Sequence, residues 1–508
     1  MQTSTRVIFN TIILYIKVIT SLAIALVSVP LVLKALGASD YGLYNLVAGV
    51  VAMLAFLNNS MTVSSQRYMS VAIGESNERK IISIYNTSFL LHLGLGLFVV
   101  VAFEIIGLFA IDKLNILPDR MLSAKIIYQF LVLSTFTKIV AVPFDALVNA
   151  KEDMLPFSII ELIDSVLMLA VAFSLAYIPW NKLTYYGLCV AAISVLVLLL
   201  KYSWCRYAYK EYRINLKENR GTFQIREMLS FTGWNLFGGL AMIGRNQGVA
   251  IIINLFLGTI VNAAYGVANQ INGALGHFSA TFQKAINPQL MKSEGMNDRN
   301  RLLRISFISS KFSVLALALF AVPLIIEMDG VLKLWLKGNV PPYTMRLAQF
   351  ILLLSIAYQY SVGIMSAIQA TGRIRNYQIT MGSILLLNVP IAYIILRLGY
   401  PVYYTTMAFV VLEIISLCVR LFMAKHLTGM KMNEYYRNVI FPSFVIILIP
   451  TSFALMIHFI MDSSLIRLII VTLTYGLSFV ALMFRFALEE NQRDAICLKF
   501  KQLINKRK

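Results

Sequence analysis

Charged side chains inside long apolar runs are the part of this sequence best suited to chemistry. Most of its 44 Lys and Arg residues lie in or beside the connections between those runs, and four lie within them. A charge at the bilayer centre costs on the order of 3 kcal/mol, so each needs a wet cavity, a partner or a short reach to water. The four are Lys17, Lys138, Arg245 and Lys311. Lys311 lies close enough to a helix end to extend its amine into water.

Basic residues in such positions suit an anionic ligand. A pyrophosphate is a compact multiple anion, whose oxygens Arg binds in a bidentate fork while Lys supplies a mobile point charge. We therefore expect Arg245 and Lys17 to bind a diphosphate, with Lys138 as a further candidate. Arg67, at the cytoplasmic end of an apolar run, is expected to capture the headgroup as it enters. The alternative for Arg67 is an ordinary positive anchor at a helix end.

Polar residues at helical spacing accompany these charges. Asn235 and Arg245 are ten residues apart with Gly238 and Met242 between them at steps of three and four, so they share a helix face. Amide groups on such faces can bind sugar hydroxyls in a common cavity, or can hold membrane helices together. Both interpretations are open for the other members of the set, Asn58, Asn269, Asn272 and Gln283.

Two acidic residues in one apolar run form a separate candidate site. Glu161 and Asp164 are three residues apart and share a helix face. Carboxylates within a membrane span can bind Na⁺ or a proton and couple transport to an ion gradient. They can equally neutralise Lys138 on the neighbouring run. An ion gradient is the only cofactor that we expect.

Composition defines the class of protein. Apolar residues make up 59% of the 508 residues and charged residues 13%, about half the charged fraction of a soluble globular protein. The sequence is therefore that of an all-α integral membrane protein. Its formal net charge of +20 is explained by positively charged cytoplasmic connections rather than by nucleic acid. The four His and four Cys residues show no metal-binding spacing, and no loop carries a catalytic set, so we expect no enzyme.

Apolar runs long enough to cross a membrane predict about 14 transmembrane helices. Connections on the side of the N-terminus carry roughly three times as many Lys and Arg as the opposite connections, which places both termini in the cytoplasm. We predict an N-terminal six-helix bundle, a cytoplasmic basic linker, a C-terminal six-helix bundle, two appended helices and a basic cytoplasmic tail. Their bounds are 1–204, 205–227, 228–423, 424–487 and 488–508.

The two bundles show signs of an internal repeat. Leu36-Gly37 is followed by Tyr44, and Leu257-Gly258 is followed by Tyr265 at the same distance, 221 positions later. The same offset relates the ends of two further apolar runs. Because six helices separate the copies, both enter the membrane in the same direction. Parallel repeats of this kind are typical of transporters with a central site at the repeat interface.

Three stretches carry a family resemblance. They are NTIILYIKVITSLAIALVSVPLVLKALGASDYGLYNLVAGV, the duplicated LGxxxxxxY element, and VLKLWLKGNVPPYTMRLAQFILLLSIAYQYSVGIMSAIQATGRIR. The sequence resembles the polysaccharide transporter family of the multidrug/oligosaccharidyl-lipid/polysaccharide (MOP) superfamily, and most closely its Wzx-type O-antigen flippases.

This resemblance implies a MATE-like fold of two six-helix bundles around a V-shaped cavity. It also implies a function, the translocation of undecaprenyl-pyrophosphate-linked oligosaccharide across the bacterial inner membrane by alternating access. The expected partners are that lipid-linked glycan, membrane lipids and proteins of polysaccharide polymerisation and assembly. The main alternative is a MATE-type exporter of organic cations driven by Na⁺ or H⁺, which would need a cavity dominated by acids and aromatic residues. A structural scaffold for polysaccharide assembly is a third class, and it would not need Arg245.

Overall fold

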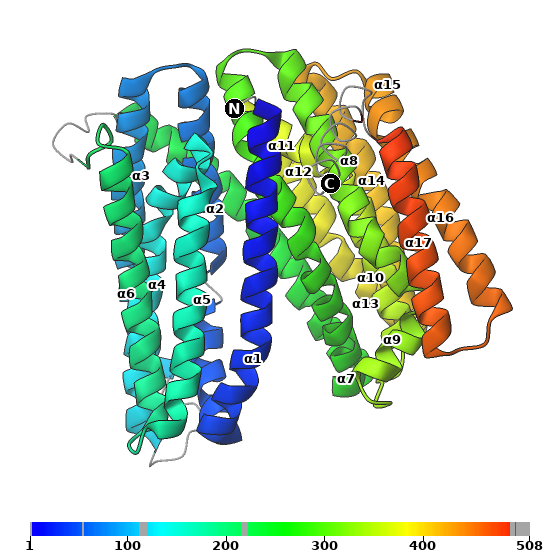
Figure 1. Cartoon of the computed structure of the whole chain (residues 1–508), viewed down its shortest axis with the longest axis horizontal. Coiled ribbons are helices and arrows are strands. Elements are labelled where there is room, and N and C mark those ends of the chain that lie inside the picture. Colours follow the sequence, from blue (N-terminus) through cyan, green and yellow to red (C-terminus); the bar gives the residue numbers. More distant parts are fainter. Residues whose placement is uncertain (1–2, 53–54, 111–119, 215–221, 488–492, 494–508) are drawn as a thin grey trace, which may run out of the picture. The chain divides into compact units, whose positions relative to one another are not determined.

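The computed structural model describes residues 3–52, 55–110, 120–214, 222–487 and 493, and all regular structure in this part of the chain is helical (Figure 1). The α-helices are α1 (Thr3–Ala52), α2 (Ala55–Gly74), α3 (Glu78–Ala110), α4 (Met121–Lys151), α5 (Met154–Ser174), α6 (Lys182–Ala208), α7 (Thr222–Gly295), α8 (Arg299–Ile326), α9 (Met328–Trp335), α10 (Thr344–Gln359), α11 (Val362–Thr371), α12 (Arg375–Leu386), α13 (Asn388–Arg397), α14 (Tyr403–Thr428), α15 (Met432–Tyr435), α16 (Phe441–Ile460) and α17 (Leu465–Phe486).

The helices have the length and composition of membrane spans. Within the described residues, eleven helices are long and apolar enough to cross a bilayer, or twelve if the pair α10 and α11, bent by 44°, forms one span. A helix satisfies its own backbone hydrogen bonds, which is why apolar segments in lipid adopt it. The predicted all-helical, multi-pass fold is confirmed, and the predicted count of about 14 is approximate. One of the eleven helices, Ile225–Gly295, is 71 residues long, and at 1.5 Å per residue it exceeds the length of two spans.

The backbone follows the sequence repeat. α1 and α7 each contain one non-helical residue, Gly37 (φ 78°, ψ 167°) and Gly258 (φ 77°, ψ −175°), which are 221 positions apart. The positive φ values of Ser76 (55°) and Asn297 (56°) are separated by the same offset. It also relates the first residues of α3 and α8 and those of α6 and α14. The two halves are therefore copies of one helix pattern, as predicted.

Contacts divide the chain into two compact units. The first comprises Met1–Gly239 and Lys284–Asp298, and the second Leu240–Gln283 and Arg299–Lys508. Both ends of α7 thus belong to the first unit, while its middle belongs to the second. The predicted domain boundaries at 204, 228 and 423 stay predictions. Part of the predicted basic linker and nearly all of the tail over 488–508 lie outside the described residues.

In the first unit, α4 packs against α2, α3 and α6 around a buried cluster that includes Met69, Tyr85 and Phe144. The last turn of α2 crosses the end of α7 with their backbones in contact. A Cβ atom at Gly74 would overlap the Lys292 carbonyl oxygen. A Cβ atom at Gly295, the last residue of α7, would likewise overlap the Val71 carbonyl oxygen of α2. Only glycine permits so close a crossing.

In the second unit, α8 packs against α10, α11 and α16, and a core cluster fills the space between the middle of α7, α8, α10 and α14. The crossing of α11 and α8 again requires a glycine, because a Cβ at Gly363 would overlap the Ser306 carbonyl oxygen. The hairpin of α16 and α17 is attached by Glu327, which bonds His458 (2.7 Å) and Arg467 (2.9 Å).

Candidate substrate and ion sites

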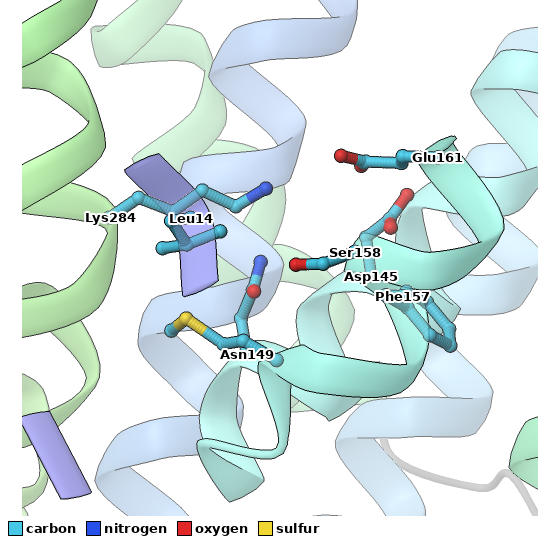
Figure 2. A pocket seen from close by; sticks show the side chains of 8 residues that line it. Leu14, Asp145, Asn149, Phe157, Ser158, Glu161 and Lys284 are labelled. Atoms are coloured by element: carbon cyan, nitrogen blue, oxygen red, sulfur yellow. The ribbon is translucent and has the colours of Figure 1, made fainter. Parts of the chain in front are cut away.

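A cavity of about 230 Å³, its open mouth included, lies in the first unit between α1, α4, α5 and the end of α7 (Figure 2). Three apolar side chains, Leu14, Met154 and Phe157, form part of its wall. The remaining lining residues are polar or charged, and they are Asp145, Asn149, Ser158, Glu161 and Lys284. A concentration of ionisable groups inside a membrane span marks a candidate functional site.

Two ion pairs lie at this cavity. The Lys17 amine on α1 is 2.6 Å from the Glu161 carboxylate on α5, and both side chains are about a quarter exposed. The Lys201 amine on α6 is 2.7 Å from the Asp145 carboxylate on α4, and Lys201 is 8% exposed. Lys284 also interacts electrostatically with Glu161, and Figure 2 shows its amine extending toward that carboxylate. Glu161 therefore lies between two lysines.

The predicted residues of the first unit lie in different surroundings. Lys138 is exposed on α4 and interacts electrostatically with Asp164. The sequence offered neutralisation of Lys138 as one role for Glu161 and Asp164. Asp164 has Lys138 as its main basic neighbour, whereas Glu161 pairs with Lys17. Asn235 is buried in α7. Asn58 lies in α2, but its side chain is outside the described residues.

Arg67 is buried rather than exposed at a membrane interface. Its guanidinium lies over the rings of Tyr68 and Phe231, at 4.5 and 5.1 Å from the ring centres. It also interacts electrostatically with Glu227 and Glu294. A desolvated guanidinium over aromatic faces contributes to packing. This position favours a structural role for Arg67 at the junction of α2 and the start of α7, and capture of a headgroup stays an untested prediction.

In the second unit, Arg245 is half-buried near the middle of a span. Its Nε donates to the side-chain oxygen of Asn246 at 3.1 Å, and it interacts electrostatically with Tyr265 and Tyr358. Among the described residues, no carboxylate lies within ion-pair distance of it. Arg245 thus has neutral partners and a charge that a ligand can still compensate.

Polar residues of α10 face those predicted on α7. Asn272 accepts a hydrogen bond from Ser355, and the Gln283 amide donates weakly to Gln359 at 3.5 Å. Asn269 instead donates to the carbonyl oxygen of Tyr265 in its own helix, at 2.9 Å. The sequence prediction missed this face of α10, although Ser355, Tyr358 and Gln359 have the spacing of one helix face.

Sequence reasoning also missed three buried or half-buried cations. Arg420 is 2% exposed in α14, where it pairs with Glu413 and donates to Ser361 Oγ at 2.9 Å. Lys201 and Lys284 lie within helices at the charged cavity. All three lie near the ends of the predicted apolar runs, where a basic residue is expected to belong to a connection. Glu413 and Arg420 are seven residues apart, two helical turns, and this spacing of opposite charges was the available signal.

The described part of the chain thus has the architecture of a multi-pass membrane protein. No protein-family model matches its sequence, and no curated protein matches it. Solved structures of similar fold include an outward-facing multidrug resistance MATE transporter of the MOP superfamily (TM-score 0.71, 14% identity, covering 83% of this chain and 95% of that one).

Two further structures are similar. A MOP superfamily transporter from Pyrococcus furiosus, described as having a binding pocket of reversed polarity that suggests a different function, has a TM-score of 0.68 at 12% identity, covering 83% of this chain and 95% of that one. The MATE transporter ClbM in complex with Rb⁺ has a TM-score of 0.66 at 14% identity, covering 85% and 95%. The structural neighbours are MATE and MOP superfamily transporters, and at these identities the likeness establishes the fold alone.

Proposed function

We propose that this protein is a transporter that moves undecaprenyl-pyrophosphate-linked oligosaccharide, such as an O-antigen or capsule repeat unit, from the inner to the outer leaflet of the bacterial inner membrane. The MATE-like fold supports transport by alternating access between two parallel repeats. In this proposal both termini lie in the cytoplasm, and proteins of polysaccharide polymerisation receive the product. The function is translocation without chemical conversion of the substrate.

The environment of Arg245 carries the proposal. A guanidinium in the middle of a span needs a compensating charge, and the neighbours of Arg245 are an amide and two phenols. A diphosphate supplies that charge and fits the fork of donors on arginine. The amides of Asn269 and Asn272 lie on the same long helix and suit sugar hydroxyls. An isoprenoid tail needs only lipid.

The charges argue against the export of organic cations, the function of the alternative MATE-type exporter. A binding site for a cation needs a carboxylate with an uncompensated charge. Among the described residues, three acids in spans are each paired with a basic residue, and they are Asp145, Glu161 and Glu413. Glu104 accepts a hydrogen bond from the neutral Gln129 amide at an exposed position. The ion pair with Lys17 weakens the predicted role of Glu161 in Na⁺ or H⁺ coupling, and Asp164 has Lys138 as an electrostatic neighbour. The similarity to a multidrug resistance transporter keeps this alternative in the test.

A transport assay in proteoliposomes tests the proposal. Flipping of fluorescent undecaprenyl-pyrophosphate oligosaccharide is measured beside uptake of a cationic dye. We expect wild-type protein to flip the lipid, and Arg245→Ala to reduce the rate at least about tenfold, which corresponds to about 1.4 kcal/mol. Arg245→Lys should retain part of the activity because the charge remains.

Arg397→Ala is the matched control, since Arg397 lies at the end of α13 and bonds the Tyr393 hydroxyl at an exposed position. It should flip the lipid at the wild-type rate. Uptake of the dye without movement of the lipid would overturn the proposal in favour of the cation exporter.

A further inference from the structure

Glu161 occupies the position that an anionic ligand would take at the charged cavity. Its carboxylate is held by Lys17 at 2.6 Å and faces Lys284 (Figure 2). We infer that the Lys17–Glu161–Lys284 cluster is a self-inhibited anion site, in which Glu161 acts as a tethered counter-ion until phosphoryl oxygens of a diphosphate displace it. This inference rests on the proposed function and adds a second anion site in the first unit.

The charges around Glu161 leave an excess of one positive charge. Within the described part of the chain, the charged groups that interact with Glu161 or Asp164 form one cluster, which also includes Asp145, the partner of Lys201. The acids are Asp145, Glu161 and Asp164, and the bases are Lys17, Lys138, Lys201 and Lys284. A surplus cation in a span is stabilised by an anion from outside the cluster. With Glu161 displaced, two uncompensated charges face the ligand.

Hydrogen-bond donors point into the same cavity. Ser158 is only 3% exposed, and its hydroxyl has no hydrogen-bond partner within the described structure. A buried hydroxyl without a partner is costly, which indicates a ligand or water at this place. Figure 2 shows the Ser158 hydroxyl and the Asn149 side chain directed toward the space beside Lys284. A hydroxyl, an amide and an ammonium group together form a donor set for phosphoryl oxygens.

The two ion pairs at the cavity differ in how readily they exchange. Lys17 and Glu161 are 23% and 25% exposed, so water and a ligand can reach both groups. Lys201 is 8% exposed and lies over the Phe157 ring, so its bond to Asp145 is shielded from solvent. Glu161 is therefore the carboxylate that a ligand displaces, while Asp145 keeps Lys201 neutralised.

Binding to the full-length protein in nanodiscs tests the inference. Calorimetry would measure the affinity for inorganic pyrophosphate and, separately, for undecaprenyl pyrophosphate. We expect Glu161→Gln to bind both ligands about tenfold more tightly than wild type, because the competing charge is gone while the side-chain shape is kept. Lys284→Ala should weaken binding about tenfold. A ligand that binds only in its lipid-linked form identifies the lipid as the source of the phosphoryl groups.

Asp329→Asn is the matched control, because it removes one carboxylate from an exposed pair with Lys333 and should leave the affinity unchanged. Should Glu161→Gln fail to fold, Glu161→Asp withdraws the carboxylate by one methylene and should still tighten binding. Unchanged or weaker binding in the folded Glu161 variant overturns the inference. Because flipping by wild type is measured independently, this failure would leave the proposed function standing, whereas loss of both phosphate binding and flipping in wild type would reject both.

Discussion

The two halves of the molecule share their backbone pattern and differ in every charge that matters at the candidate sites. Gly37 and Gly258 break α1 and α7 in the same conformation, and Gly74 lies at the same repeat position as the glycine that ends α7. The charged positions are not repeated. At the repeat-equivalent positions, 221 residues away, Lys17 corresponds to Gly238, Glu161 to Gly382, Arg420 to Leu199 and Arg245 to Ile24.

This difference separates what builds the fold from what performs the function. Glycine is duplicated at the breaks, Gly37 and Gly258, because both halves need the same bend, and at the two repeat positions that meet where α2 crosses the end of α7. Gly363 is not duplicated, since Val142 occupies its repeat position. The ion pairs also differ in burial. Lys17 and Glu161 are about a quarter exposed, whereas Arg420 and Glu413 are 2% and 4% exposed. We interpret the first pair as exchangeable and the second as a permanent part of the core of its unit.

The largest expected effect comes from breaking the buried pair. Glu413→Ala leaves the Arg420 guanidinium uncompensated in the interior and should lower the free energy of unfolding by about 3–5 kcal/mol. Glu161→Ala should lower it by at most about 1 kcal/mol, because that pair is partly solvated. Denaturant titration in detergent micelles, followed by intrinsic fluorescence, measures both. Equal losses for the two variants would remove the distinction between the pairs.

A double replacement is the control for this prediction. Glu413→Leu combined with Arg420→Met removes both charges and keeps apolar volume, so most of the lost stability should return. If the double variant is as unstable as Glu413→Ala, the loss comes from altered packing and not from the unpaired guanidinium.

The next effect concerns the helix crossings, one in each unit. Gly74→Ala and Gly363→Ala each drive a methyl group into a backbone carbonyl of the crossing helix, and we expect each to cost about 1–3 kcal/mol. Gly273→Ala is the control, because a Cβ at that helical position meets no atom within 4 Å. It should be neutral or slightly stabilising by helix propensity. The same titration checks all three, and a stable Gly74→Ala variant would mean that α2 and α7 can separate without cost.

The fold was largely predictable from the sequence because its determinants are local. Apolar length predicts spans, and the repeated Leu-Gly and Tyr spacing correctly predicted two copies of one pattern. The helix count was harder to predict. α7 contains two helices that meet at the non-helical Gly258 without an intervening loop, and the span matching α4 is divided into α10 and α11 by a bend at Tyr360 and Ser361. Such breaks depend on tertiary packing and have no length signal.

The sites were less predictable because pairing depends on which helix faces which. The sequence identified Lys17 and Glu161 separately, but only the structure shows that they bond each other. Arg420 lies near the end of an apolar run, where a charge ordinarily reaches water, and its burial follows from packing against α10 and α12. Arg245 lies within an apolar helix long enough to span a membrane, and its role in binding an anion stays a prediction.

The smallest expected effect tests the duplicated breaks themselves. Gly37→Ala and Gly258→Ala place a Cβ where no atom lies within 4 Å, so backbone strain alone should act. With φ near 78° and ψ near 180°, both residues occupy a region that essentially only glycine adopts, at a cost of about 1–3 kcal/mol for other residues. We expect equal losses in the two variants, toward the lower end of this range, since neither site is packed. Unfolding titrations of both variants measure this. If only one variant loses unfolding free energy, the two breaks are not equally required for stability, although they have the same conformation.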